Sequence, residues 1–160
     1  MALIVQKYGG TSMGSTERIA QVAKRVAKWA RAGHQVVVVP SAMSGETNRL
    51  LALAKELAPG KPTQDYYREQ DMLAATGEQA SSALLAIALQ AEGRPAVSYA
   101  GWQVPIRTSN AYTKARIDSI DDQRVRADLD GGKVVIITGF QGVDEGNNIT
   151  TLGRGGSDTS

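Results

Sequence analysis

The sequence contains no cysteine, a single histidine and few aromatic residues: two Trp, five Tyr and one Phe among 160 residues. Without cysteine these 160 residues can form neither a disulfide nor a thiolate metal site, which fits a reducing compartment. The single histidine, His34, excludes most sites that are built from imidazole groups. It stands just before an expected strand, so we interpret it as a surface residue.

The sequence also lacks a large excess of charge of one sign and long apolar runs. The 18 basic and 16 acidic residues leave a net charge of +2, and no segment concentrates lysine and arginine. This balance, with so few aromatic rings for base stacking, argues against a nucleic-acid partner. The apolar runs at 36–39 and 134–137 are far shorter than the roughly 20 residues of a membrane helix. Residues 1–5 are too few for a signal peptide, so we expect a soluble cytoplasmic protein without a membrane partner.

Short β-branched runs alternate with longer stretches of helical period. This alternation is typical of a mostly parallel sheet with helices on both faces, and the length favours one domain. The predicted fold class is therefore α/β, a three-layer αβα sandwich. Strands are expected at 3–8, 36–39, 96–99 and 134–138, and helices between Ser15 and Gly33, around 50–57, over 64–90 and around 125–129. Residues 104–120 are predicted to be irregular or short β structure.

The long helix expected over 64–90 is rich in alanine. Gly77 lies inside it, where glycine costs about 1 kcal/mol relative to alanine, so close packing or a nearby ligand is expected there. Helical spacing predicts a buried side made of Met72, Leu73, Thr76, Ala80, Ala83, Leu84 and Ile87.

Lys7 ends the first expected strand and is followed by the glycine-rich run 8–16. The glycine spacing from Gly9 to Thr16 matches a phosphate-binding P-loop, but Ser15 stands where that motif requires lysine. Taken separately, a lysine at a strand end is usually solvated and a double glycine is usually a turn. Their adjacency at the carboxyl end of a strand favours a phosphate site, with Lys7 as its cation.

Three other segments offer polar groups at comparable places. Residues 41–47 follow the second strand, and their hydroxyls are either helix caps or ligands. Residues 138–142 follow the fourth strand. Residues 153–158 combine glycines, an arginine and an aspartate at an expected helix start, where anions bind and where Asp158 could hold a cation. We expect these segments to converge on one crevice.

Two further acidic features have ordinary interpretations. A lone glutamate in a helix, such as Glu78, is most often solvated. The group Asp118, Asp121 and Asp122 is interpreted as a solvated turn with caps, because its spacing provides no obvious metal cage.

Five ordered motifs together closely resemble the aspartate kinases of the amino-acid kinase superfamily, over essentially all 160 residues: 7–12, 41–47, 77–79, 139–142 and 151–158. The resemblance implies the amino-acid kinase fold. It also implies phosphoryl transfer from ATP to the side-chain carboxylate of L-aspartate, the entry to lysine, methionine and threonine synthesis. Magnesium would be carried by ATP rather than by protein ligands.

The resemblance also implies roles for individual residues. Lys7 and Asp158 would be catalytic, with Asp158 orienting Lys7 and helping to organise the magnesium-bound nucleotide. Glu78 would meet the aspartate ammonium group, and Arg154 a substrate carboxylate. The nucleotide and phosphate group would be bound by Lys7, Tyr8, Gly9, Gly10, Ser41 and Ser157, and the substrate by Thr47, Glu78, Phe140, Arg154, Gly155, Gly156 and Ser157.

The chemistry of this reaction suits a chain with one histidine. The acceptor carboxylate of aspartate, with a reference pKa of about 3.9, is already ionised at neutral pH, so no general base is needed. The reaction needs two anions brought together and charge neutralised on the γ-phosphoryl oxygens, which lysine, backbone N–H groups and magnesium can do.

Aspartate kinases continue beyond the part that this sequence resembles, with the adenine-binding segment and regulatory ACT domains. Residues 1–160 are therefore predicted to be the N-terminal portion of the catalytic domain, with negligible kinase activity alone. The strand at 134–137 is expected to lack a covering helix, so that the chain forms a homo-oligomer or associates with the rest of the enzyme. Alternatives are a noncatalytic aspartate- or phosphate-binding or assembly module, or a glutamate or acetylglutamate kinase.

Overall fold

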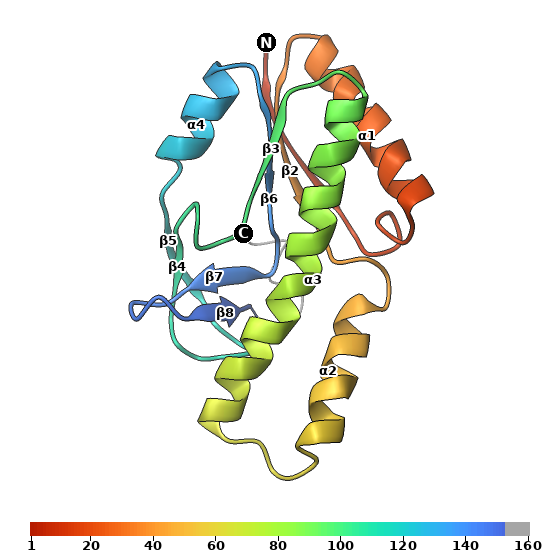
Figure 1. Ribbon diagram of the computed structural model, residues 1–160. Helices are drawn as coiled ribbons and strands as arrows, with labels where there is room; N and C mark the ends of the chain where they lie inside the picture. The colour runs from red at the N-terminus through yellow and green to blue at the C-terminus, as the bar shows by residue number, and fades with distance from the viewer. Residues whose placement is uncertain (153–160) are drawn as a thin grey trace.

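The computed structural model describes residues 1–152 (Figure 1). The helices and strands expected from the sequence are present, and residues 141–143 and 149–151 form two strands that were not predicted. In chain order they are β1 (Leu3–Tyr8), α1 (Thr16–Arg31), β2 (Gln35–Pro40), α2 (Glu46–Leu57), α3 (Gln64–Ala91), β3 (Ala96–Tyr99), β4 (Ile106–Thr108), β5 (Ile117–Ile120), α4 (Gln123–Asp130), β6 (Val134–Ile137), β7 (Gln141–Val143) and β8 (Ile149–Thr151).

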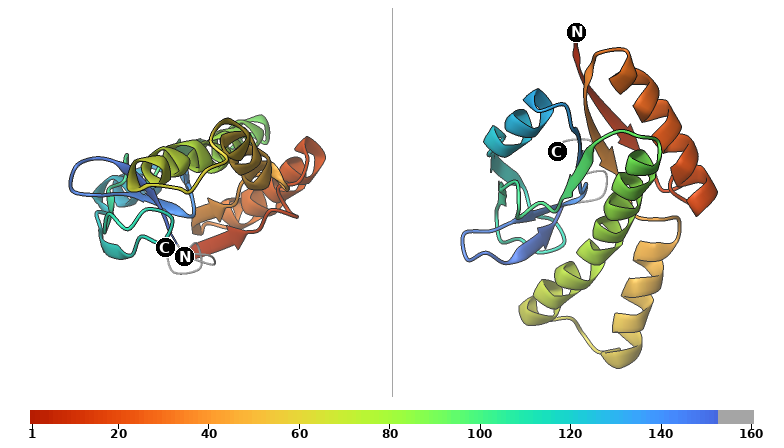
Figure 2. Two further views of the ribbon diagram at one scale, coloured as in Figure 1. Left: turned by 90° about the horizontal axis from the view of Figure 1, so that it is seen from below. Right: turned by 45° about the horizontal axis from the view of Figure 1, so that its top comes forward.

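Four parallel strands form the central sheet, in the order β1-β2-β6-β3. Alternate residues of a strand point to opposite faces. Val36 and Val38 of β2 accordingly pack in the core with α1 and α3, whereas Val37 packs in a second core with Val125 and Leu129 of α4. Figure 2 shows α1 and α3 on one side of this sheet and α4 on the other. The predicted three-layer αβα sandwich is thus confirmed.

A smaller sheet with the order β5-β4-β7-β8 adjoins the carboxyl ends of β3 and β6. It is mixed, since β4 pairs with β7 in parallel and the other pairs are antiparallel. β7 passes so close to β4 that a Cβ added at Gly142 would lie 2.4 Å from Cγ2 of Thr108. The short β structure expected within 104–120 is therefore confirmed, as β4 and β5.

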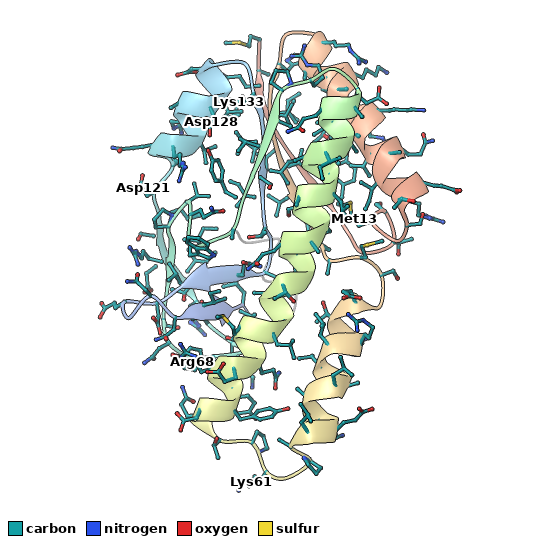
Figure 3. The ribbon with its side chains drawn as sticks, in the orientation of Figure 1. Met13, Lys61, Arg68, Asp121, Asp128 and Lys133 are labelled. Carbon is teal, nitrogen blue, oxygen red and sulfur yellow. The ribbon has the colours of Figure 1, made fainter. Side chains whose placement is uncertain are left out.

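Local sequence signals set the ends of α1. The Ser15 hydroxyl accepts a hydrogen bond from the Arg18 N–H at 3.2 Å, as an N-cap residue should. Gly33 lies just beyond the end with a φ of +91°, a conformation that glycine adopts without steric cost. The loop before the helix folds back under it, and its Met13 is fully buried beside α1 and α3 (Figure 3).

The predicted buried side of α3 is wrong. Met72 is 48% exposed and Ile87 is 61% exposed, because the helix turns its small and polar residues inward. The small side chains let α3 approach α1 and the loop after β2 closely, which larger side chains would prevent. Its buried residues are Asp71, Ala74, Ala75, Gly77, Glu78, Ser81, Ser82, Leu85, Ala86 and Leu89.

Among residues 1–152, α3 is also the one helix that is long and apolar enough to cross a membrane, judged by length and composition. Half of the apolar window is buried inside the fold. The helix packs against α1, β3 and β8, as the core helix of a folded domain does.

The expectation that β6 lacks a covering helix is wrong as well. Val135 and Ile136 are fully buried, because α4 covers one face of the strand and α3 the other. Within the central sheet, large apolar side chains are exposed on the edge strand β1 instead, where Leu3 is 49% exposed and Val5 is 65% exposed.

Candidate functional site

The loops that follow β1 and β2 lie side by side. The two strands are in register, with Tyr8 opposite Pro40, and the Ser41 N–H donates to the Tyr8 carbonyl at 2.8 Å. Lys7 is exposed at the end of β1. After it, hydrogen bonds from the N–H groups of residues 12–14 to carbonyls of residues 9–11 fold the glycine-rich run into a tight turn. The predicted adjacency of these two carboxyl-end loops is confirmed.

α3 packs directly on the loop after β2. A Cβ added at Gly77 would lie 3.0 Å from the Cβ of Ala42, and the Ser81 hydroxyl donates to the Ser41 carbonyl at 2.7 Å. The close packing predicted for Gly77 is therefore confirmed. It brings Glu78, the next residue, to the same loop.

Glu78 is buried, so the interpretation as a solvated helical glutamate is wrong. Its side chain is 4% exposed, and this burial raises the carboxyl pKa from 4.5 to about 7, although backbone N–H groups of Ala42 and of Glu78 itself act to lower it. Its Oε2 atom has no hydrogen-bond partner within the described part of the chain. A buried carboxylate with an open oxygen is suited to receive a cationic group.

The hydroxyls of residues 41–47 do not cap the helix that follows. α2 begins at Glu46 after Gly45, whose φ of +78° makes the turn, and the helix has no side-chain cap. Of the two alternatives for these hydroxyls, helix caps or ligands, the first is therefore wrong. Ser41, in the loop that contacts α3, and Thr47, in the first turn of α2, are both half-buried.

The segment after β6 is also tied to α3. Phe140 has a φ of +69°, and its carbonyl accepts from the Leu152 N–H at 2.8 Å. The buried Gln141 side chain donates from Nε2 to the Ala75 carbonyl at 3.0 Å. α3 thus connects the loops after β2 and β6, as the expected convergence of carboxyl-end loops requires.

Thr138 begins this segment and is 2% exposed, and its Oγ1 is buried without a partner in residues 1–152. The Ser82 hydroxyl in α3 is also buried without a hydrogen-bond partner in residues 1–152. The two residues line a small cavity of about 140 Å³ beside Gln79.

Several predicted site residues lie outside the described residues, namely Arg154, Gly155, Gly156, Ser157 and Asp158. Their roles stay predictions. So does the facing of Lys7 and Asp158 across one cleft.

Asp71 is a residue that sequence reasoning missed. It is 1% exposed in α3, and its carboxylate accepts hydrogen bonds from the N–H groups of Thr113 and Thr151 and from the Thr151 hydroxyl. Burial raises its carboxyl pKa, and these hydrogen bonds act to lower it. A signal was available, because a spacing of seven residues places Asp71 and Glu78 on the same face of a helix.

The three aspartates near α4 are exposed, as expected, but the predicted caps are wrong, because Asp118 lies in β5 and Asp122 at the N-cap of α4 makes no capping hydrogen bond. Asp121 accepts from the Gln123 N–H at 3.1 Å, and Asp122 forms an exposed ion pair with Arg126 at 2.7 Å. Among the residues that the structure describes, no three His, Asp or Glu side chains come together as a metal-binding group.

Comparison with known proteins gives a consistent result. The profile of the amino acid kinase family matches residues 2–160. The chain is 62% identical to an aspartate kinase of Pseudomonas fluorescens and 52% identical to aspartokinase 2 of Bacillus subtilis, in each case over all 160 residues. It spans 38% of the length of these relatives.

Solved structures agree with the fold. The aspartate kinase of Synechocystis is 46% identical with a TM-score of 0.79, over 98% of this chain and 25% of that one. Aspartokinase III of E. coli, solved with aspartate and ADP, has a TM-score of 0.83 over 99% of this chain and 45% of that one. At 24% identity, this second likeness supports the fold alone.

Proposed function

The chain belongs to the amino acid kinase family, and from this premise we propose that it supplies the N-terminal portion of the catalytic domain of an aspartate kinase. The reaction would be phosphoryl transfer from MgATP to the side-chain carboxylate of L-aspartate. The observation that carries the proposal is the placement of Glu78, a buried carboxylate with an open oxygen, against the loop that follows β2.

Glu78 would bind the ammonium group of the amino acid. A carboxylate whose burial disfavours its charged form gains most from a cation that pairs with it. This preference favours an amino acid with a free ammonium group over a nucleotide or an acetylated amino acid as the acceptor. Ser41 and Thr47 would line the same region, and Phe140 would form a wall of the pocket.

Lys7 would neutralise charge on the transferring phosphoryl group. Its position at the end of β1, directly before the tight glycine turn, supports this role, with Tyr8, Gly9 and Gly10 beside the phosphates. Magnesium would arrive with ATP and spread the charge of the phosphoryl oxygens. Arg154, Ser157 and Asp158 would complete the site, with Arg154, Gly155 and Gly156 at the substrate.

No general base is required of the described residues. The acceptor carboxylate is ionised at neutral pH, so the protein has to position two anions and offset their repulsion. We further propose a cytoplasmic location, and association of this chain with the rest of the enzyme or with a second copy.

A chimera tests the proposal directly. The matching 160 residues of the Pseudomonas fluorescens aspartate kinase would be replaced by this chain, which aligns with them over its whole length. We expect ADP formation that depends on L-aspartate, with trapping of the acyl phosphate by hydroxylamine as the second readout. L-Glutamate and N-acetylglutamate serve as control acceptors, and preference for either would favour that kinase instead.

The isolated chain and the chimera together separate the enzyme from a binding module. We expect the isolated chain to show negligible turnover by itself. Calorimetric titration with L-aspartate and then MgATP would detect binding without turnover. A folded chimera that binds aspartate but turns over no acceptor would identify a noncatalytic module and contradict the proposed reaction.

A further inference from the structure

Asp71 is buried in α3, and both oxygens of its carboxylate accept hydrogen bonds. Oδ1 accepts from the Thr151 hydroxyl at 2.7 Å, and Oδ2 accepts from the Thr151 N–H at 2.7 Å. The Thr113 N–H points at both oxygens, at 3.2 and 3.0 Å. No described lysine or arginine forms an ion pair with it. Hydrogen bonds to an ionised acceptor are about twice as strong as those between neutral groups. The carboxylate therefore holds the backbone at Thr113 and Thr151 in place.

The residue that Asp71 holds is the last of β8, and its neighbours are held too. The Thr151 carbonyl accepts from the Ala115 N–H at 3.1 Å, and the Leu152 N–H donates to the Phe140 carbonyl at 2.8 Å. Thr151 and Leu152 are 3% exposed each. The end of β8 is therefore held by hydrogen bonds on both Thr151 and Leu152.

Further contacts tie the β7–β8 hairpin to α3. Arg68, near the start of α3 (Figure 3), donates from Nε to Oδ1 of Asn148 at 2.8 Å. Gln141 of β7 reaches the Ala75 carbonyl, as described above. Asp71 and Glu78 lie seven residues apart, a rise of about 10 Å along the helix. α3 thus sets where β8 ends relative to Glu78.

We propose that Asp71 is a positioning residue of the phosphotransfer site, whose carboxylate holds the end of β8 at Thr151 in place against the helix that carries Glu78. The inference rests on the proposed function. Asp71 touches neither substrate nor phosphate, and it acts through the end of β8. Its loss should lower turnover in protein that is still folded.

Hydrogen exchange tests the anchoring without any activity. In Asp71→Asn an NH2 group replaces one carboxylate oxygen. This donor would face the N–H of Thr113 or Thr151, so that at least one of these hydrogen bonds is lost. We expect exchange at the Thr151 and Thr113 amides to speed up by about 10- to 100-fold, the equivalent of one charge-assisted hydrogen bond. Amides of β2 and β6 should be unchanged. Asp65→Asn, an exposed aspartate in the first turn of the same helix, is the matched control.

Kinetics of the chimera test the effect on the reaction. We expect Asp71→Asn to lower kcat at saturating aspartate and MgATP by about 10- to 100-fold, measured where the protein is fully folded. Should that variant fail to fold, the pair Thr151→Val and Thr151→Ser gives the same test. Valine removes the hydroxyl bond and should lower kcat, whereas serine keeps the hydroxyl and should restore it.

The outcomes separate this inference from the proposed function. Unchanged exchange at β8 in Asp71→Asn overturns the anchoring. Faster exchange with unchanged kcat, or equal kcat for Thr151→Val and Thr151→Ser, overturns the positioning role. An unsubstituted chimera without turnover contradicts the proposed function and the positioning role with it, while the exchange result still decides whether Asp71 anchors β8.

Discussion

Asp71 and Glu78 lie seven residues apart on the same buried face of α3, and their carboxylates have opposite surroundings. Asp71 accepts hydrogen bonds at both oxygens from Thr113 and Thr151, whereas Oε2 of Glu78 has no partner in residues 1–152. The first carboxylate is occupied by the fold. The second is open, and its pKa is raised to about 7.

Stability should depend on pH through Glu78. A carboxyl pKa of about 7 in the folded state, against 4.5 when unfolded, means that the folded state binds more protons between these values. The free energy of unfolding should therefore fall as pH rises from about 4.5 to about 7, by up to about 3 kcal/mol. Glu78→Gln should flatten this slope in urea unfolding, and Glu56→Gln, an exposed control, should keep it. Equal slopes in all three proteins would contradict the raised pKa.

The affinity for aspartate should increase with pH, whereas the free energy of unfolding should fall with pH. The ammonium group needs Glu78 ionised, so affinity should increase as pH rises through about 7. We expect binding at pH 8 to be about tenfold tighter than at pH 6, the ratio of the ionised fractions of a carboxyl group with a pKa of about 7. Calorimetric titration of the chimera measures it. Pairing of Glu78 with the ligand is refuted if Glu78→Gln binds aspartate as tightly and with the same pH profile.

Substitution of Gly77 by alanine, the smallest side chain, should destabilise the fold. Alanine gains about 1 kcal/mol in helix propensity, but its Cβ would lie 3.0 Å from the Cβ of Ala42. Overpacking of this kind costs about 1–3 kcal/mol, so Gly77→Ala should destabilise the fold by about 1 kcal/mol. The double variant Gly77→Ala with Ala42→Gly should recover the loss in thermal unfolding. A single variant more stable than the parent would show that the contact relaxes freely.

Two apolar residues of α3 should respond differently to truncation. Leu85 is fully buried, so Leu85→Ala should cost about 2–5 kcal/mol. Ile87 is 61% exposed, so Ile87→Ala should change stability by no more than about 0.5 kcal/mol. Urea unfolding of both variants checks which face of the helix is buried. Similar costs at both positions would mean that another surface covers Ile87.

Lys7 should be required for turnover but not for folding. Its side chain is exposed at the end of β1, and loss of one preorganised charge donor costs about 10²–10³ in rate. We expect Lys7→Ala in the chimera to lower kcat by at least that factor with an unchanged unfolding midpoint. Lys24→Ala, an exposed lysine of α1, is the control. Near-normal turnover of Lys7→Ala would reject the assignment.

Much of the fold and part of the site could be predicted because their causes are local. Ser15 caps α1 through a bond that spans three residues, and Gly33 ends the helix with its own φ. The adjacency of the loops after β1 and β2 follows from parallel pairing, which brings strand ends to one edge. Local patterns did not predict the inner face of α3, since side-chain size alone does not say how closely α1 and Ala42 approach.

The sequence by itself determined the four strands of the central sheet, the four helices, the ends of α1, and the placement of Lys7 and residues 41–47 at the carboxyl edge of the sheet. These depend on backbone preferences and on the side-chain periods of helices and strands. Only the tertiary structure decided that Glu78 is buried with an open oxygen and that Asp71 holds Thr151, which is 80 residues away. Burial and long-range hydrogen bonds depend on which segments pack together, and neighbouring residues in the chain do not encode that.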